Sequence, residues 1–159
     1  MTALNKDVLK PALLQDLDDE IAAAVVAAQQ AQAAAAHEDN QPENQYDTLS
    51  LEAAYLAHGQ SERILALQQE RIRLAQWAVP SFDEDDEVAL GALVQLVHPQ
   101  LGERWVWLTR FGGRRLTVAG IDVTLLSLQA PLAQRLLQRG VGDDVSWQDS
   151  SGWVIESLS

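Results

Sequence analysis

The stretch HEDNQPENQYD, residues 37–47, decides how the first half of the chain folds, because it separates two long segments with helical spacing of apolar residues. Its carboxylates and amides surround one proline, a composition typical of a polar connection. Since the flanking segments have similar lengths, the pattern predicts an antiparallel helical hairpin with residues 37–47 at one end. The loop is either a solvated connection or the working tip of the hairpin, and we favour the second interpretation.

The two flanking segments each predict a helix of about 30 residues, which spans roughly 45 Å. The first runs from about residue 6 to 37, with Pro11 expected in its first turn. The second starts at a cap formed by Asp47 or Thr48 and ends near Trp77. Alanine replaces large apolar residues in the later part of the first segment, which favours a narrow two-helix packing over a thick core.

Residues 79–87, VPSFDEDDE, are an acidic linker by composition, and beyond them the pattern changes. Short runs rich in β-branched and aromatic residues alternate with turn signals, among them Gly112-Gly113, expected as a hairpin turn, and Ser151-Gly152. One helix interrupts the strands, with Pro131 at its start and Gly140 just past its end.

These patterns together predict an α+β protein. We expect an N-terminal helical hairpin, a coiled coil, over residues 1–78 with an acidic tip at 37–47. The acidic linker over residues 79–87 then leads to a small domain at 88–159 with a mostly antiparallel sheet.

The net charge of −12 lies in the first 87 residues, since residues 88–159 hold six arginines and six acidic side chains. Nucleic-acid binding needs a basic face that displaces counterions from phosphates, so we expect no independent DNA binding. An acidic rod fits a basic protein cleft, or it is simply a solvated surface. The chain has no cysteine, which excludes disulfides and thiolate sites.

The chain contains no apolar segment of membrane-spanning length. Its most apolar run, residues 21–28, is far too short and rich in alanine. No charged region leads into an apolar core at the N-terminus, so no signal peptide is expected. We therefore expect a cytoplasmic protein without a membrane partner.

No motif for catalysis or for a tightly bound cofactor is present, and we expect no enzyme activity of the chain's own. Three histidines lack the spacing of metal ligands: His37, His58 and His98. Three serines lack a sequence cue for a base: Ser127, Ser146 and Ser157. Trp105 and Trp107 lie on one face of a strand and predict packing, and Arg114-Arg115 is expected to be solvated.

The acidic side chains of the loop remain as candidates for chemistry. Mg²⁺ is usually held by one or two carboxylates together with water and phosphate oxygens. Such a tip completes a Mg²⁺ site only beside a second protein that supplies the other ligands. From chemistry alone, a merely soluble loop is the favoured alternative.

Residues 130–147, APLAQRLLQRGVGDDVSW, resemble the C-terminal signature of the bacterial Gre transcript-cleavage factors. In that family a Ser-Pro-(Leu/Ile)-Gly segment opens a helix containing Ala-Leu-Leu, followed by Val-Gly-Asp-(Glu/Asp)-Val. Pro131-Leu132, Leu136-Leu137 and residues 141–145 match, while Ala130 replaces the leading serine. The loop resembles the family's tip, which reads His/Asn-Gly-Asp, two residues, Glu-Asn, two residues, Tyr. The order of parts also matches, so the resemblance covers nearly the whole chain.

The resemblance implies an FKBP-like C-terminal domain that docks on RNA polymerase at the mouth of its secondary channel. It implies a transcription elongation factor-like protein whose tip enters that channel, near the RNA 3′ end, and modulates transcript cleavage or elongation. Asp39 and Glu43 would share a Mg²⁺ with the polymerase, supported by three further tip residues, Glu38, Asn44 and Tyr46. The docking region implied by the C-terminal signature contains Pro131, Leu132, Gly142, Asp143 and Asp144.

The tip departs from the family's pattern in one respect. Alignment on Glu43-Asn44 places Asn40 where the family has its essential aspartate, and alignment on Asp39 and Tyr46 places Pro42 where it has glutamate. Either way one carboxylate is displaced, unless the loop bulges by one residue.

Three other functions stay open at this point. A channel-binding competitor or inhibitor would use the same surface without promoting cleavage. A helical-hairpin adaptor or dimerisation arm would bind a protein unrelated to transcription. A prolyl isomerase would need an aromatic-lined pocket in the C-terminal domain, where four tryptophans fall: Trp105, Trp107, Trp147 and Trp153.

Overall fold

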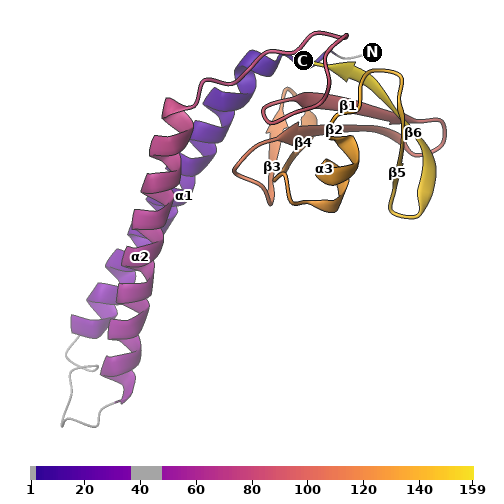
Figure 1. Ribbon diagram of the computed structural model, residues 1–159. Helices are drawn as coiled ribbons and strands as arrows, with labels where there is room; N and C mark the ends of the chain where they lie inside the picture. Colours follow the sequence, from indigo (N-terminus) through magenta and orange to yellow (C-terminus); the bar gives the residue numbers. More distant parts are fainter. Residues whose placement is uncertain (1–2, 37–47) are drawn as a thin grey trace. The chain divides into compact units, whose positions relative to one another are not determined.

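The computed structural model describes residues 3–36 and 48–159, which form two compact units (Figure 1). The hairpin unit, residues 13–77, contains the second long helix and all but the first turn of the first. The sheet unit combines the N-terminal segment up to Ala12 with residues 78–159. The α+β class expected from the sequence is confirmed. No pattern along the chain predicts that the N-terminal segment groups with the sheet.

Helices α1 (Leu9–Ala36) and α2 (Thr48–Gln76) run side by side in the hairpin unit (Figure 1). A short 3-10 helix, Lys6–Val8, precedes α1, and the side chain of Asn5 accepts a hydrogen bond from the backbone N–H of Asp7 at 3.0 Å. Pro11 lies in the first turn of α1 as expected. Buried positions recur every four or seven residues, as in a helix–helix seam: Leu13, Leu17, Ala24 and Ala28 on α1, Leu67 and Leu74 on α2.

An ion pair links the two helices near the start of α1 and the end of α2. The Arg71 guanidinium donates through Nε to Oδ1 of Asp18 at 2.5 Å and through Nη2 to Oδ2 at 3.2 Å. A looser pair joins Arg63 and Glu20 at 4.0 Å. The hydrogen bond from Arg71 holds the pKa of the Asp18 carboxyl below its ordinary value. Two hydrogen bonds between one guanidinium and one carboxylate fix the position of each helix along the axis of the other and also hold the helices side by side.

The sheet unit contains a six-stranded sheet in the order β3-β4-β2-β1-β6-β5. Its strands are β1 (Leu93–His98), β2 (Gly102–Leu108), β3 (Arg114–Val118), β4 (Ile121–Leu126), β5 (Asp144–Trp147) and β6 (Ser150–Leu158). All neighbouring pairs are antiparallel except β2 and β4, which run parallel. The expected mostly antiparallel sheet is therefore confirmed.

The short helix α3 (Pro131–Leu136) packs on one face of this sheet, and side chains of the helix and the strands together form a hydrophobic core. The buried side chains of that core include Val106, Leu132, Leu136, Trp153 and Ile155. Successive residues of a strand point to opposite faces, so Trp105 and Trp107, on either side of Val106, share the opposite face of the sheet, as their spacing predicts. Both indoles are buried there. The indole N–H of Trp107 donates to the backbone oxygen of Gly91 at 3.1 Å.

The prediction of a hairpin turn at Gly112-Gly113 is wrong. β2 and β3 are not neighbours, because β4 lies between them and pairs with both. The glycine at 112 has a different role: a Cβ atom there would lie 2.5 Å from the backbone nitrogen of Ser127. Gly112 is required because the loop after β2 passes against the loop before α3.

Two further boundaries differ from the prediction. Ser151-Gly152 lies inside β6, and the turn is made by Gln148 and Asp149, both with positive φ, at 52° and 60°. Helix α3 ends at Leu136 rather than near residue 139. It stops early because Gln138 and Arg139 exchange backbone hydrogen bonds with Val88, at 3.0 and 2.8 Å, which a continued helix would prevent.

Replacing Gly112 by alanine is expected to lower the free energy of unfolding by about 2 kcal/mol, because the added methyl group overlaps backbone atoms of Ser127. Urea unfolding followed by circular dichroism measures the change. Gly59→Ala in α2 is the matched control: its methyl group meets no atom within 4 Å and should stabilise the helix by about 0.5–1 kcal/mol. Equal stability of the two variants would contradict the close approach at Gly112.

Replacing Asp18 by asparagine is expected to destabilise the hairpin unit more at pH 7 than at pH 2.5. Because Arg71 lowers the folded-state pKa of Asp18, the carboxylate contributes stability above its ordinary value of 3.8 and loses it as the pH falls through the folded-state pKa. Urea unfolding of both proteins at the two pH values measures the difference. A difference of the same size at both pH values would show that the ion pair is not its cause.

Candidate docking site

A groove of about 730 Å³ lies on the α3 face of the sheet unit, next to the start of α3. We call it the α3 groove. It is lined by residues from four strands, the start of α3 and the β5–β6 turn: residues 103–106, Arg115, residues 120–122, Thr124, Leu126, residues 130–132, Trp147 and Gln148.

Strand register brings the floor of the α3 groove together. Val106 on β2 lies beside Thr124 on β4, and Thr124 lies beside Arg115 on β3. Neighbouring strands present paired residues on the same face, so these three side chains form a row across the sheet. The row changes from apolar to charged toward the β3 edge.

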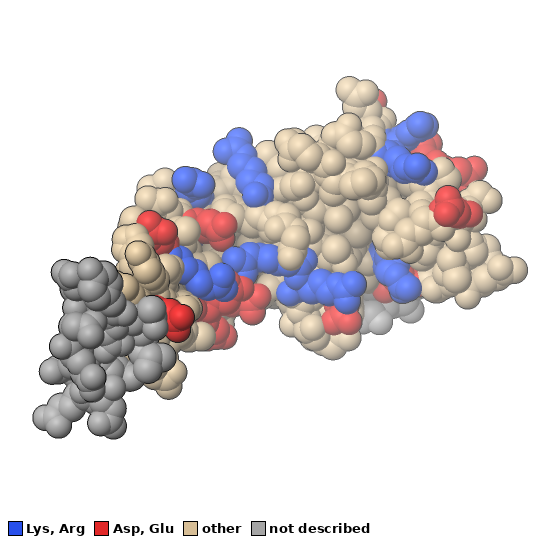
Figure 2. All heavy atoms as spheres, turned by 90° about the horizontal axis from the view of Figure 1, so that it is seen from below, with Lys and Arg blue, Asp and Glu red and all other residues tan. Residues whose placement is uncertain are grey.

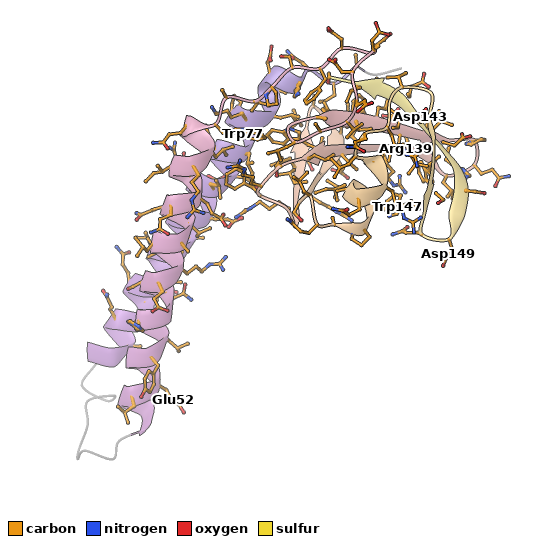
Figure 3. All side chains as sticks on the ribbon, in the orientation of Figure 1. Glu52, Trp77, Arg139, Asp143, Trp147 and Asp149 are labelled. Atoms are coloured by element: carbon orange, nitrogen blue, oxygen red, sulfur yellow. The ribbon has the colours of Figure 1, made fainter. Side chains whose placement is uncertain are left out.

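The wall of the α3 groove is aromatic and held in place by packing. The ring of Trp147 lies 5.7 Å from the buried ring of Trp153 at a tilted angle, a favourable geometry for two aromatic rings. The Arg104 guanidinium lies over the same Trp153 ring at 6.0 Å. Trp147 itself is only half-buried and lies close to α3 (Figure 3). The groove therefore offers a fixed, partly exposed indole.

Charges of both signs surround the α3 groove. Asp122 accepts a hydrogen bond from the Thr117 hydroxyl at 2.7 Å. Glu103 also lines the groove, but its carboxylate is held on the opposite face of the sheet, where it accepts from the Trp105 indole at 2.5 Å and from Gln95 at 3.0 Å. Two arginines, Arg104 and Arg115, also line the groove. On the face shown in Figure 2, basic and acidic side chains likewise lie close together. Such a mixture fits a protein surface better than a row of phosphates.

The residues predicted for docking fall into two places. Pro131, exposed at the start of α3, and Leu132, buried, both line the α3 groove. Asp143 and Asp144 line a more open concavity of about 650 Å³ beside Arg135 and Arg139. Figure 3 shows Arg139 and Asp143 away from Trp147. The five residues thus do not form one site.

Gly142 and Asp143 have a clear structural role in the turn before β5. The Asp143 carboxylate accepts the backbone N–H of Gly140 at 2.8 Å, and the Gly142 N–H donates to Ile155 at 2.8 Å. Gly142 has a φ of 91°, which favours glycine. The Val-Gly-Asp segment therefore positions β5, and with it Trp147, at the groove.

Sequence reasoning missed Arg104 and interpreted Arg115 only as a solvated residue. Trp147 was considered only as one of four tryptophans, of which the other three are buried. No local signal separates Trp147 from them, because the packing of β5 against β6 decides which indole stays exposed.

The tip residues Asp39, Glu43, Glu38, Asn44 and Tyr46 lie outside the described residues, so their assignment stays a prediction. Among the residues that the structure describes, no group of three histidine, cysteine or acidic side chains could hold a metal ion. His58 pairs with Glu62 at 3.2 Å on the surface of α2. His98 accepts two backbone N–H groups through Nδ1 and contacts the backbone oxygen of Ser151 through Nε2.

Within the described part of the chain, neither long helix is apolar enough to cross a membrane. The comparison with protein families and the comparison with curated proteins each found no match.

Solved structures similar to this chain include the GreA factor homolog 1 (Gfh1) protein of Thermus thermophilus, at 16% identity and a TM-score of 0.37, covering 92% of this chain and 94% of the other. A second structure of the transcription factor Gfh1 has the same identity and TM-score, covering 92% and 93%. Gfh1 of Thermus aquaticus is 15% identical with a TM-score of 0.35, covering 91% and 92%. Similarities at these values do not show family membership.

Proposed function

We propose that this chain binds RNA polymerase through its sheet unit and places the tip of its hairpin in the secondary channel, where it modulates transcript cleavage or elongation. The observation that carries the proposal is the α3 groove. Its lining contains Pro131 and Leu132, two of the residues through which the sequence resembles the Gre C-terminal signature.

The α3 groove has the properties of a protein-docking surface. Binding energy at protein interfaces concentrates on a few aromatic and arginine side chains near an apolar centre. Here Trp147 provides a fixed indole, Leu132 and Val106 provide apolar floor, and arginines and carboxylates provide a polar rim. No cofactor is needed for such a role.

The hairpin suits an element that reaches into a channel. At 1.5 Å per residue, the 28 residues of α1 span about 42 Å. The Arg71–Asp18 pair holds the two helices in register, and the buried alanines Ala24 and Ala28 keep the later part of the seam free of bulky side chains. The acidic balance of the first 87 residues favours a basic environment.

The chemistry proposed for the tip belongs to the polymerase and is only completed by this chain. Asp39 and Glu43 would share a Mg²⁺ with the polymerase's active centre, where paired metal ions stabilise the attacking and leaving oxygens. The displaced Glu43-Asn44 pair supports a second candidate, a channel-binding competitor that occupies the same site without promoting cleavage.

Replacing Asp39 and Glu43 by alanine together is expected to abolish any effect on transcript cleavage while polymerase affinity changes less than threefold, because the tip adds ligands to the metal and not docking contacts. Shortening of labelled RNA in backtracked polymerase complexes measures cleavage. The matched control, Glu84→Ala with Asp85→Ala in the linker, removes the same charge. Full activity of the tip variant would contradict the tip assignment. A wild-type chain that leaves the transcript unchanged yet blocks an authentic cleavage factor would instead identify the competitor.

Replacing Trp147 by alanine is expected to weaken binding to core RNA polymerase at least tenfold, because it removes the exposed indole of the α3 groove. Fluorescence anisotropy of a labelled chain measures the dissociation constant. Leu101→Ala removes a half-exposed apolar side chain from the β1–β2 turn, outside the groove, and should leave the affinity unchanged. Equal affinities of the two variants, both folded by circular dichroism, would place docking elsewhere.

A further inference from the structure

Helix α2 carries apolar side chains on the side that faces away from α1. Its seam with α1 contains Leu67 and Leu74, which are 6% and 0% exposed. Leu65 and Ile72 each lie two residues earlier, which is about 200° around the helix at 3.6 residues per turn. These two side chains are 56% and 55% exposed. The outer side of α2 therefore carries apolar side chains that the described residues leave open to solvent.

The exposed side chains follow the heptad spacing of a coiled coil. Positions separated alternately by four and three residues run along the outer side of α2 for about 32 Å. We call these positions the outer stripe: Leu51, Tyr55, His58, Glu62, Leu65, Gln69 and Ile72. Its apolar and aromatic members are from 49% to 73% exposed. A single exposed leucine is ordinary, but apolar residues at this spacing are typical of a helix that packs against another helix.

The outer stripe also contains polar residues, which limit how tightly a partner helix can bind. His58 and Glu62 pair at 3.2 Å within α2, and both side chains are more than 70% exposed. Polar residues at such positions lower the stability of a coiled coil and favour one register of its helices. We therefore expect a weak association with a defined geometry.

Charges beside the outer stripe indicate which partner fits it. Glu52 and Arg73 are both exposed, and each follows a stripe residue by one position. Figure 3 shows Glu52 near the end of α2 that lies away from Trp77. When two copies of α2 pack antiparallel with Tyr55 facing Ile72 of the second copy, Glu52 of each copy lies beside Arg73 of the other. The two-fold axis of such a dimer creates this pair twice.

The opposite orientation has no such complementarity. In a parallel pair each stripe residue faces its own counterpart, so Glu62 would lie against Glu62 of the second copy. Like charges at these positions repel each other. The charge pattern therefore favours an antiparallel arrangement of two copies.

We propose that two copies of this chain associate through their outer stripes as an antiparallel pair of α2 helices, with Glu52 of each copy beside Arg73 of the other. The inference does not depend on polymerase binding. The occupant is a second copy because the charges that flank the stripe complement themselves under a two-fold axis. Since three of the seven stripe positions are polar, we expect a dissociation constant of about 10–100 µM.

The first test measures self-association of the full chain by sedimentation velocity. The dimer fraction is expected to rise as the protein concentration increases from about 5 to about 500 µM, because a weak dimer follows mass action. A chain that remains monomeric at about 500 µM would overturn the proposal.

The second test identifies the surface with two matched variants. Leu65→Glu is expected to raise the dissociation constant about tenfold or more, because it places a charge near the centre of the apolar interface. Leu56→Glu introduces the same charge at another leucine of α2, 63% exposed but outside the outer stripe, and should change the constant less than about twofold. Circular dichroism checks that both variants keep their helices. Equal dissociation constants of the two variants would show that the outer stripe is not the interface.

The third test determines the orientation of the two helices by charge exchange. Glu52→Arg and Arg73→Glu are each expected to raise the dissociation constant about threefold or more, because both copies of the pair become like-charged. The double variant exchanges the two charges at constant net charge and should restore the wild-type constant. A double variant that binds no better than either single variant would refute the antiparallel pairing.

Discussion

The parallel pairing of β2 with β4 is the constraint on which the sheet unit depends. After β2 the chain does not turn back on itself; it forms β3, reverses at Ala119 and Gly120, and returns as β4 between β2 and β3. This order places Thr124 between Val106 and Arg115, which creates the floor of the α3 groove. It also forces the loop after β2 against the loop before α3, where only glycine fits at position 112.

Buried contacts beneath the α3 groove hold its side chains in position. Trp153 is buried and contacts Trp147 on one side and the Arg104 guanidinium on another, so two potential binding side chains are held by one core residue. The turn between β5 and β6 places two non-glycine residues at positive φ beside the groove, an arrangement that costs conformational energy. A buried core residue therefore holds side chains of the proposed docking surface in place.

The two units use polar contacts for different purposes. In the hairpin unit the Arg71–Asp18 pair is exposed and fixes the register of two helices whose seam is partly alanine. In the sheet unit the Lys6 ammonium is half-buried and gathers backbone oxygens from segments distant in sequence. Loss of the exposed Arg71–Asp18 pair costs little, because water replaces each partner. Loss of the Lys6 contacts would leave the backbone oxygens of Pro80 and Ser159 without that donor.

The sequence by itself determined the class of the fold, the two long helices and their polar connection, and the place of Pro131 at the start of α3. These features are local: helical spacing, capping and proline geometry act over a few residues. The tertiary structure decided which strands pair, that Gly112 meets Ser127, that α3 stops at Leu136 because Val88 takes the next backbone groups, and that Trp147 alone of four tryptophans stays half-exposed at a groove. Each of these depends on residues far apart in the chain, and no pattern along one segment can encode a contact whose partner is supplied by another.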